Sequence, residues 1–264
     1  MRSGAVTLSG ESAGEGPALV LLHGLTATRR YVVMGSRLLE RGGFRVIGYD
    51  ARGHGESSPA PVSSAYAYPD LAADLLAVLD ATGIDRAVLV GNSMGAHTAM
   101  AFALAHPERV AALVQVTPAY DGTPSDDLAA WDALADGLEH GGVDGFIAAW
   151  RPAVAERWRD TVTTVARQRL ERHRHPGAVA DALRAVPRSA PFDGLDSLER
   201  VTAPTLVVGS RDDADPGHPL AVAEAYAERL PDAELVVEDP GASPLAWQGA
   251  QLSRAIAAFV ERVL

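Results

Sequence analysis

The chain has 264 residues and a formal net charge of −11, which disfavours nucleic acids and anionic membrane surfaces as partners. It contains no cysteine, and all 23 of its basic residues are arginine, so disulfides, thiolate nucleophiles and Schiff-base lysines are excluded. Its length and its apolar fraction of 47% suit one large globular domain, or a core with an inserted subdomain.

The N-terminal segment MRSGAVTLSGESAGEG has no apolar stretch of signal-peptide length. No apolar run approaches the roughly 20 residues that a membrane-spanning helix needs. We therefore expect a soluble, cytoplasmic protein that acts on a small-molecule substrate, without nucleic-acid or membrane partners. The oligomeric state cannot be predicted from the sequence.

Short apolar runs recur along the chain and are rich in leucine and β-branched residues on both faces, as is typical of parallel strands covered by helices. The expected strands are 18–24, 44–50, 86–92, 110–118, 204–210 and 233–239. Helical patterns lie between them, at 69–82, 94–105, 219–230 and 250–263. This alternation predicts an α/β fold with a doubly wound, mostly parallel sheet.

The strand pattern is interrupted between residues 119 and 200. This stretch has helical patterns only, and it holds three of the four tryptophans: Trp131, Trp150 and Trp158. We interpret it as a helical cap inserted into a core made of residues 1–118 and 201–264. Helices of the cap are expected to cover the mouth of the site, and its aromatic residues to line an apolar pocket.

The strongest motif is VLVGNSMGAH at 88–97, a G-x-S-x-G pattern at the end of an expected strand and the start of an expected helix. Ser93 stands between Gly91 and Gly95, and a sharp turn at this point needs small residues on both sides. We expect Ser93 to be a nucleophile at a strained turn. The N–H of Met94, at the start of the helix, could then stabilise an oxyanion.

A second motif, LLHGLTAT at 21–28, follows another expected strand. The N–H of Leu25 can point at the same oxyanion as the N–H of Met94. For the side chain of His23 we favour a structural role in shaping the loop.

A third motif is YDARGHGESS at 49–58. We interpret it as a tight supporting loop, in which Arg52 pairs with Asp50 and Ser57 closes the turn. His54 is expected to be a loop residue and not a base.

Together these motifs resemble the α/β-hydrolase superfamily, and the resemblance covers essentially the whole chain. The matching pieces are H-G, D-x-R-G-x-G-x-S, G-N-S-M-G and, after a late strand, G-S-R-D-D-A-D-P. G-N-S-M-G is similar to the corresponding turn of carbon–carbon bond hydrolases and also of esterases. The resemblance implies a cofactor-free serine hydrolase.

In that superfamily the acid of the catalytic triad follows the penultimate strand in G-x-x-D-x-x-x-P. Gly209, Asp212 and Pro216 fit this pattern, with Asp213 and Asp215 as competitors. The alternative is an acidic surface loop without a catalytic role.

The superfamily's histidine follows the last strand, usually as G-H with a proline soon after. Here the sequence is Gly241-Ala242-Ser243-Pro244, so Ala242 occupies the position of the base, and no histidine follows residue 218. Without a base a serine hydroxyl is a poor nucleophile at neutral pH. The triad therefore needs a histidine from elsewhere.

His218, in DPGHPL, is the only histidine in the same loop as the candidate acids. Either it supplies the base, with its second nitrogen facing Asp212 or Asp215, or it is an ordinary residue at the start of a helix. His97 is expected to be carried away from the serine or under the cap. His173 and His175 diverge on a helix and make a poor metal pair.

The first hypothesis is a serine hydrolase of a small, mostly apolar ester, thioester or carbon–carbon substrate. Ser93, Asp212 and His218 form its triad, and the amides of Leu25 and Met94 form its oxyanion hole. The alternatives are a binding protein or a cofactor-free lyase or cyclase on the same fold. A further alternative is that Ala242 is an engineered replacement of histidine.

Overall fold

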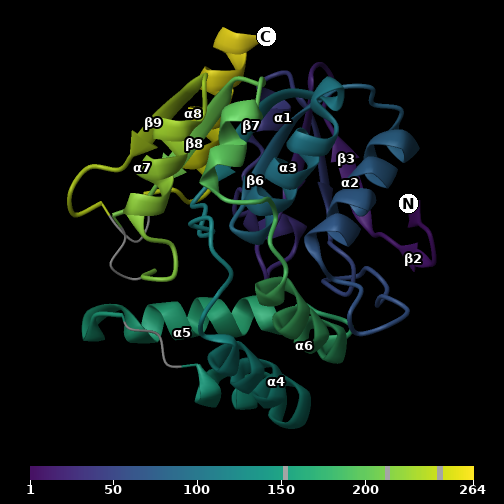
Figure 1. Ribbon diagram of the computed structural model, residues 1–264, viewed down its shortest axis with the longest axis vertical. Coiled ribbons are helices and arrows are strands. Elements are labelled where there is room, and N and C mark those ends of the chain that lie inside the picture. The colour runs from purple at the N-terminus through teal and green to yellow at the C-terminus, as the bar shows by residue number, and fades with distance from the viewer. Residues whose placement is uncertain (151–153, 212–214, 243–245) are drawn as a thin grey trace.

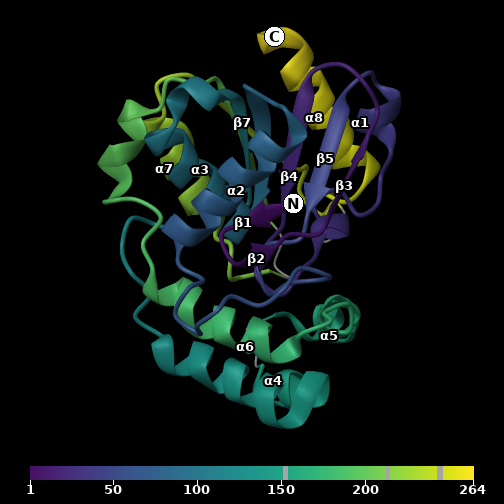
Figure 2. The same ribbon diagram turned by 90° about the vertical axis from the view of Figure 1, so that its right-hand side faces the viewer.

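A computed structural model describes residues 1–150, 154–211, 215–242 and 246–264. Its centre is a seven-stranded sheet in the order β3-β5-β4-β6-β7-β8-β9 (Figures 1 and 2). The strands are β3 (Gly10–Ala13), β4 (Ala18–Leu22), β5 (Arg45–Tyr49), β6 (Ala87–Asn92), β7 (Val110–Val116), β8 (Thr205–Gly209) and β9 (Ala233–Val237). β3 is antiparallel to β5, and the other neighbours are parallel.

The six strands expected from the sequence are all present and are shorter by one or more residues at their ends. The expected α/β fold with a mostly parallel sheet is confirmed. The antiparallel β3 was not expected, because GESA has no apolar pattern and lies exposed at the edge of the sheet. A separate two-stranded ribbon, β1 (Arg2–Ser3) and β2 (Val6–Thr7), was also not expected.

Helices cover both faces of the sheet, because each strand alternates its apolar side chains between two buried clusters. One face packs against α2 (Tyr68–Thr82), α3 (Met94–Ala105) and α7 (Leu220–Arg229). The other packs against the short α1 (Leu38–Arg41) and against α8 (Ala250–Val263). On α2 the four residues that predicted the helix, Leu71, Leu75, Val78 and Leu79, are all buried, and the helix ends at Gly83, whose φ of 67° suits glycine.

Three helices, α4 (Leu128–Ala149), α5 (Glu156–Leu170) and α6 (Pro176–Ala185), form a layer of their own beneath the sheet (Figures 1 and 2). They share an apolar cluster against which Trp131 and Trp150 pack. The described part of 119–200 contains no strand. Near its end, Phe192 and Leu198 pack with the core of the sheet.

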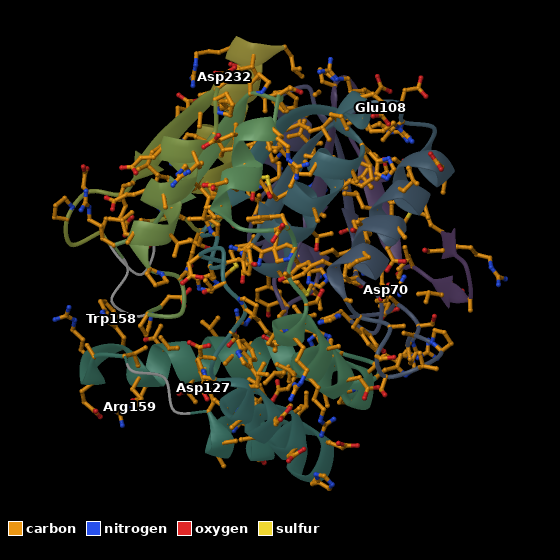
Figure 3. The ribbon with its side chains drawn as sticks, viewed as in Figure 1. Asp70, Glu108, Asp127, Trp158, Arg159 and Asp232 are labelled. Carbon is orange, nitrogen blue, oxygen red and sulfur yellow. The ribbon has the colours of Figure 1, made fainter. Side chains whose placement is uncertain are left out.

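Short 3₁₀ helices complete the chain at Arg29–Tyr31, Pro107–Arg109, Val186–Arg188 and Leu195–Arg200. Charged side chains are spread over the surface of the sheet-containing core and of the layer formed by α4, α5 and α6. The labelled Asp70, Glu108, Asp127, Arg159 and Asp232 illustrate this (Figure 3). No helix among the described residues is long and apolar enough to span a membrane.

Candidate active site

The turn between β6 and α3 places Ser93 in a conformation that few residues other than glycine adopt. Its φ is 50° and its ψ is −116°, so the expected backbone strain is confirmed. A Cβ on Gly91 would collide with the backbone of Gly95 and Ala96, and a Cβ on Gly95 would collide with the carbonyl of Leu22. Both glycines are therefore required sterically, and together they leave Ser93 half-buried at the carboxyl edge of the sheet.

The imidazole of His218 lies against the hydroxyl of Ser93. The distance from His218 Nε2 to Ser93 Oγ is 2.8 Å, and His218 Nδ1 lies 2.8 Å from Asp215 Oδ2. A neutral imidazole that donates from Nδ1–H to the carboxylate leaves Nε2 free to accept the serine O–H. The expected distance of less than about 3.5 Å between this ring and the serine is therefore found.

Asp215 is the carboxylate that contacts His218, and both come from the loop between β8 and α7. Desolvation disfavours the charged form, but the adjacent His218 and its hydrogen bond outweigh it and hold the pKa of Asp215 below its usual range. An ionised Asp215 can fix the tautomer of the ring. Asp212, the acid that we predicted first, lies outside the described residues.

The sequence named Asp215 only as a competitor, and the signal that favours it is spacing. Asp215 and His218 are three residues apart in D-P-G-H, and the N–H of His218 donates to the carbonyl of Asp215 at 3.2 Å. This turn brings the two side chains to the same side of the loop. The superfamily pattern, which relies on Pro216 as its marker, points to Asp212 instead.

The loop after β4 lies directly against the serine turn. A Cβ on Gly24 would come within 3.4 Å of the Cβ of Ser93. The ring of His23 is buried, donates from Nδ1–H to the carbonyl of Gly24 and accepts the N–H of Ala51, both at 2.9 Å. Burial lowers the pKa of His23, so the ring stays neutral. Its structural role is confirmed, and Leu25 follows directly after this fixed point.

The two amides expected to hold an oxyanion come from adjacent segments. Met94 is the first residue of α3, where an N–H has no carbonyl within the helix to bond. Leu25 precedes Thr26, whose φ of 68° turns the chain sharply. The side chain of Leu25 packs against the helical layer as well as the core.

The loop after β5 corrects one prediction, because Arg52 does not pair with Asp50. Arg52 makes two bonds of 2.7 and 2.8 Å to the buried carboxylate of Asp74 on α2, and Asp50 pairs with Arg29. A buried carboxylate must be paired, and the sequence did not show that Asp74 would be buried. The expected closure by Ser57 is confirmed, since its hydroxyl donates to the Asp50 carbonyl at 2.6 Å.

Ala242 is exposed, and its N–H donates to the carbonyl of Asp239 at 3.0 Å. A gap above Ser93 at this position stays a prediction. Trp247, the bulky residue that could have filled such a gap, donates its Nε1–H to the carbonyl of Gly209 at 2.8 Å and to the carboxylate of Glu238 at 3.2 Å. The imidazole that reaches the serine is that of His218.

Three further histidines are buried, namely His54, His97 and His173, and the last two make hydrogen bonds through both ring nitrogens. His97 bonds Tyr68 Oη through Nδ1 at 2.9 Å, and its Nε2 accepts the N–H groups of Ala119 and Tyr120, both at 3.0 Å. His173 accepts the N–H of Gly55 and bonds the carbonyl of Thr26, both at 2.9 Å. Both nitrogens of the His97 and His173 rings are occupied, so neither ring is free to act as a metal ligand.

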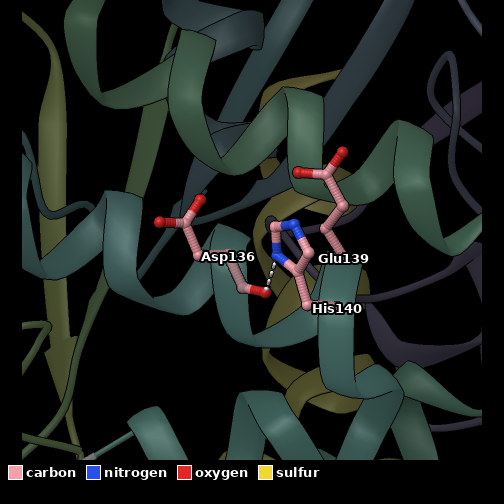
Figure 4. A group of neighbouring side chains, drawn as sticks. All are labelled: Asp136, Glu139 and His140. Atoms are coloured by element: carbon pink, nitrogen blue, oxygen red, sulfur yellow. Dashed lines mark hydrogen bonds between the residues drawn. The ribbon is translucent and has the colours of Figure 1, made fainter.

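One group of side chains on α4, Asp136, Glu139 and His140, brings ligand-type atoms together (Figure 4). The two carboxylates already pair with Arg184, at 2.5 and 2.6 Å. His140 Nδ1–H donates to the carbonyl of Asp136 at 2.9 Å. This exposed group is explained by its ion pairs and adds nothing to the candidate active site.

Comparison with known proteins identifies the family of the chain. The chain is 32% identical, over 94% of its length and 93% of the relative, to a protein of Variovorax paradoxus (strain S110) that carries the provisional name carbamate hydrolase RutD. It is 31% identical, over 93% of its length and 87% of the relative, to a 2-hydroxy-6-oxononadienedioate/2-hydroxy-6-oxononatrienedioate hydrolase of Burkholderia vietnamiensis.

Among solved structures, a thermophilic esterase from Thermogutta terrifontis superposes with a TM-score of 0.81 at 28% identity, covering 98% of this chain and 94% of the esterase. The sequence profile described as the alpha/beta hydrolase fold matches residues 17–250. The chain therefore belongs to the α/β-hydrolase fold family, and the two relatives that it matches over most of their length carry the names of hydrolases.

Proposed function

We propose that the protein is a serine hydrolase of small, mostly apolar esters, thioesters or carbon–carbon substrates, and that His218 replaces the histidine missing at Ala242. The observation that supports this most directly is the chain of contacts Ser93–His218–Asp215, with both distances at 2.8 Å. The strained turn at Ser93 and the close approach of the Gly24 loop to it support the same proposal.

In the proposed reaction Ser93 Oγ attacks the carbonyl carbon while His218 Nε2 takes its proton. Asp215 stabilises the imidazolium that forms, and the N–H groups of Leu25 and Met94 bind the oxyanion. His218 then gives the proton to the leaving group, which departs and leaves an acyl group on Ser93. Water, deprotonated by the same ring, releases the acid and restores the serine.

The preference for apolar substrates rests on the helical layer. Leu25 packs against its apolar cluster, to which Trp131 and Trp150 also belong. The proposed cap would place this apolar surface beside the acyl chain. The extent of this cap, residues 119–200, is also part of the proposal.

The test compares Ser93→Ala and His218→Ala with the parent enzyme on a panel of 4-nitrophenyl esters. Loss of one triad member costs factors of roughly 10⁴–10⁶ in kcat, so both variants should fall to that extent. His106→Ala is the matched control, because His106 is half-exposed at the end of α3 and bonds no part of the candidate active site.

A fluorophosphonate probe provides the second measurement. It should label Ser93 in the parent enzyme and should do so much more slowly in His218→Ala. Full activity in Ser93→Ala, together with no labelling of the parent enzyme, would refute the serine mechanism. Unchanged activity in His218→Ala would refute the relocated base.

A further inference from the structure

The end of β9 carries a buried carboxylate that the proposed mechanism does not use. Glu238 directly follows β9 and is only 6% exposed, and it lies near the loop that holds His218. Charged side chains are rarely buried to this degree unless their oxygens are satisfied by donors. The donors to Glu238 therefore indicate what this carboxylate holds in place.

The first set of donors comes from the beginning of the loop between β8 and α7. Ser210 Oγ–H donates to Glu238 Oε1 at 2.9 Å, and the N–H of Arg211 donates to the same oxygen at 2.6 Å. The guanidinium of Arg211 also donates from Nε to the main-chain carbonyl of Glu238 at 3.3 Å. The loop is thus fixed at its first two residues.

The second donor comes from the loop between β9 and α8. Trp247 Nε1–H lies 3.2 Å from Glu238 Oε2 and 2.8 Å from the carbonyl of Gly209, the last residue of β8. The indole ring also packs against the core cluster on that face of the sheet. Glu238 therefore joins three segments: the end of β8, the loop that leaves it, and the loop that follows β9.

We propose that Glu238 is a positioning residue for the acid–base pair, acting through the loop that it anchors. Asp215 and His218 follow Arg211 by four and seven residues, and His218 Nε2 must stay within hydrogen-bond distance of Ser93. A displacement of about 1 Å in a reacting group can cost on the order of 100-fold in rate. The segment after β9, where the superfamily's histidine is missing, thus supports the loop between β8 and α7, which holds His218. This inference rests on the proposed role of His218.

The test uses three single variants, the double variant Glu238→Gln/Trp247→Phe and one control variant. Glu238→Ala removes all the anchoring bonds of the carboxylate. In Glu238→Gln the amide oxygen can still accept from Ser210 and Arg211, but its NH₂ then faces the donor of Trp247. Trp247→Phe removes the bond to Glu238 from the other side, together with the bond to the Gly209 carbonyl. Glu234→Gln is the matched control, because Glu234 lies on β9, the strand that Glu238 directly follows, and pairs with Arg262.

Steady-state rates on 4-nitrophenyl butyrate are divided by the concentration of active sites, which is titrated to its end point with a fluorophosphonate. A residue that only stabilises the fold changes the number of sites, whereas a positioning residue changes the rate of each. We expect Glu238→Ala to lower kcat per site about 100-fold, with KM within about threefold. Glu238→Gln and Trp247→Phe should each lower it about tenfold, and the double variant little further.

If Glu238→Ala does not fold, Glu238→Gln and Trp247→Phe decide the question alone. Unchanged kcat per site in these two variants, with loss of thermal stability only, would overturn the inference. His218→Ala is measured alongside, so that the role of His218 as the base can be tested separately from the positioning role of Glu238. Parent-like activity in His218→Ala would refute the relocated base itself, whereas loss of activity there with unaffected Glu238 variants would refute the positioning role alone.

Discussion

His97 allows a quantitative prediction about how stability depends on pH. Its ring is 5% exposed and its Nε2 accepts two backbone N–H groups, from Ala119 and Tyr120. A proton on Nε2 would break both bonds. Burial, with a smaller contribution from the charge of His218, lowers the pKa of His97 from 6.5 to about 3. The unfolded chain therefore binds a proton at this residue under mildly acidic conditions, whereas the folded chain does not.

The direction in which stability changes with pH follows from this difference in proton uptake. The contribution of His97 to stability is complete above the unfolded pKa of 6.5 and is lost as the pH falls toward about 3. Between pH 8 and pH 5 the loss amounts to about 2 kcal/mol, because about 1.5 pH units lie below the unfolded pKa at 1.36 kcal/mol each. His97→Gln removes the titrating group and with it this part of the pH dependence.

The assay is urea unfolding of the parent protein and of His97→Gln at pH 8 and pH 5. We expect the variant to be less stable at pH 8 and the difference between the two proteins to shrink by about 2 kcal/mol at pH 5. His140→Gln is the control, because His140 is exposed on α4. A difference between parent and His97→Gln that is equal at both pH values, or larger at pH 5, would refute the reasoning.

Three further outcomes are expected. Asp215→Asn should lower kcat on aryl esters by a factor of about 10³–10⁴ in steady-state assays, because the amide no longer stabilises the imidazolium. Ala242→His should leave the ester rate within about twofold, since His218 already contacts the serine; a gain there, combined with no effect of His218→Ala, would indicate a decayed triad. Gly95→Ala should give little soluble folded protein, because its Cβ has no room, whereas Gly177→Ala, with open space around it, should express normally and give the parent circular dichroism spectrum.

The sequence predicted most of the sheet, because buried parallel strands and the helices between them leave strong apolar patterns. It also predicted the strained turn at Ser93, since the two glycines beside the serine have a direct steric meaning. It did not predict β3, whose pairing with β5 depends on the backbone alone. Edge strands that are exposed carry little apolar signal.

The contacts of charged side chains were harder to predict. Arg52 was assigned to its neighbour Asp50, but it bonds Asp74, 22 residues farther along the chain. Glu238 showed no signal at all, because nothing in its local sequence indicates burial or its bonds to Ser210 and Arg211. Such contacts depend on which loops the fold brings together, and short-range patterns do not contain that information.

The imidazole that contacts Ser93 and the carboxylate behind it belong to one continuous stretch of four residues, Asp215 to His218. When two such groups come from separate loops, a shift of either loop breaks their contact. Here a shift of the loop moves both together and preserves the hydrogen bond between them. Under the proposed mechanism the pair is thus a transferable unit, and grafting this segment after the corresponding strand of a related fold would move acid and base in a single exchange.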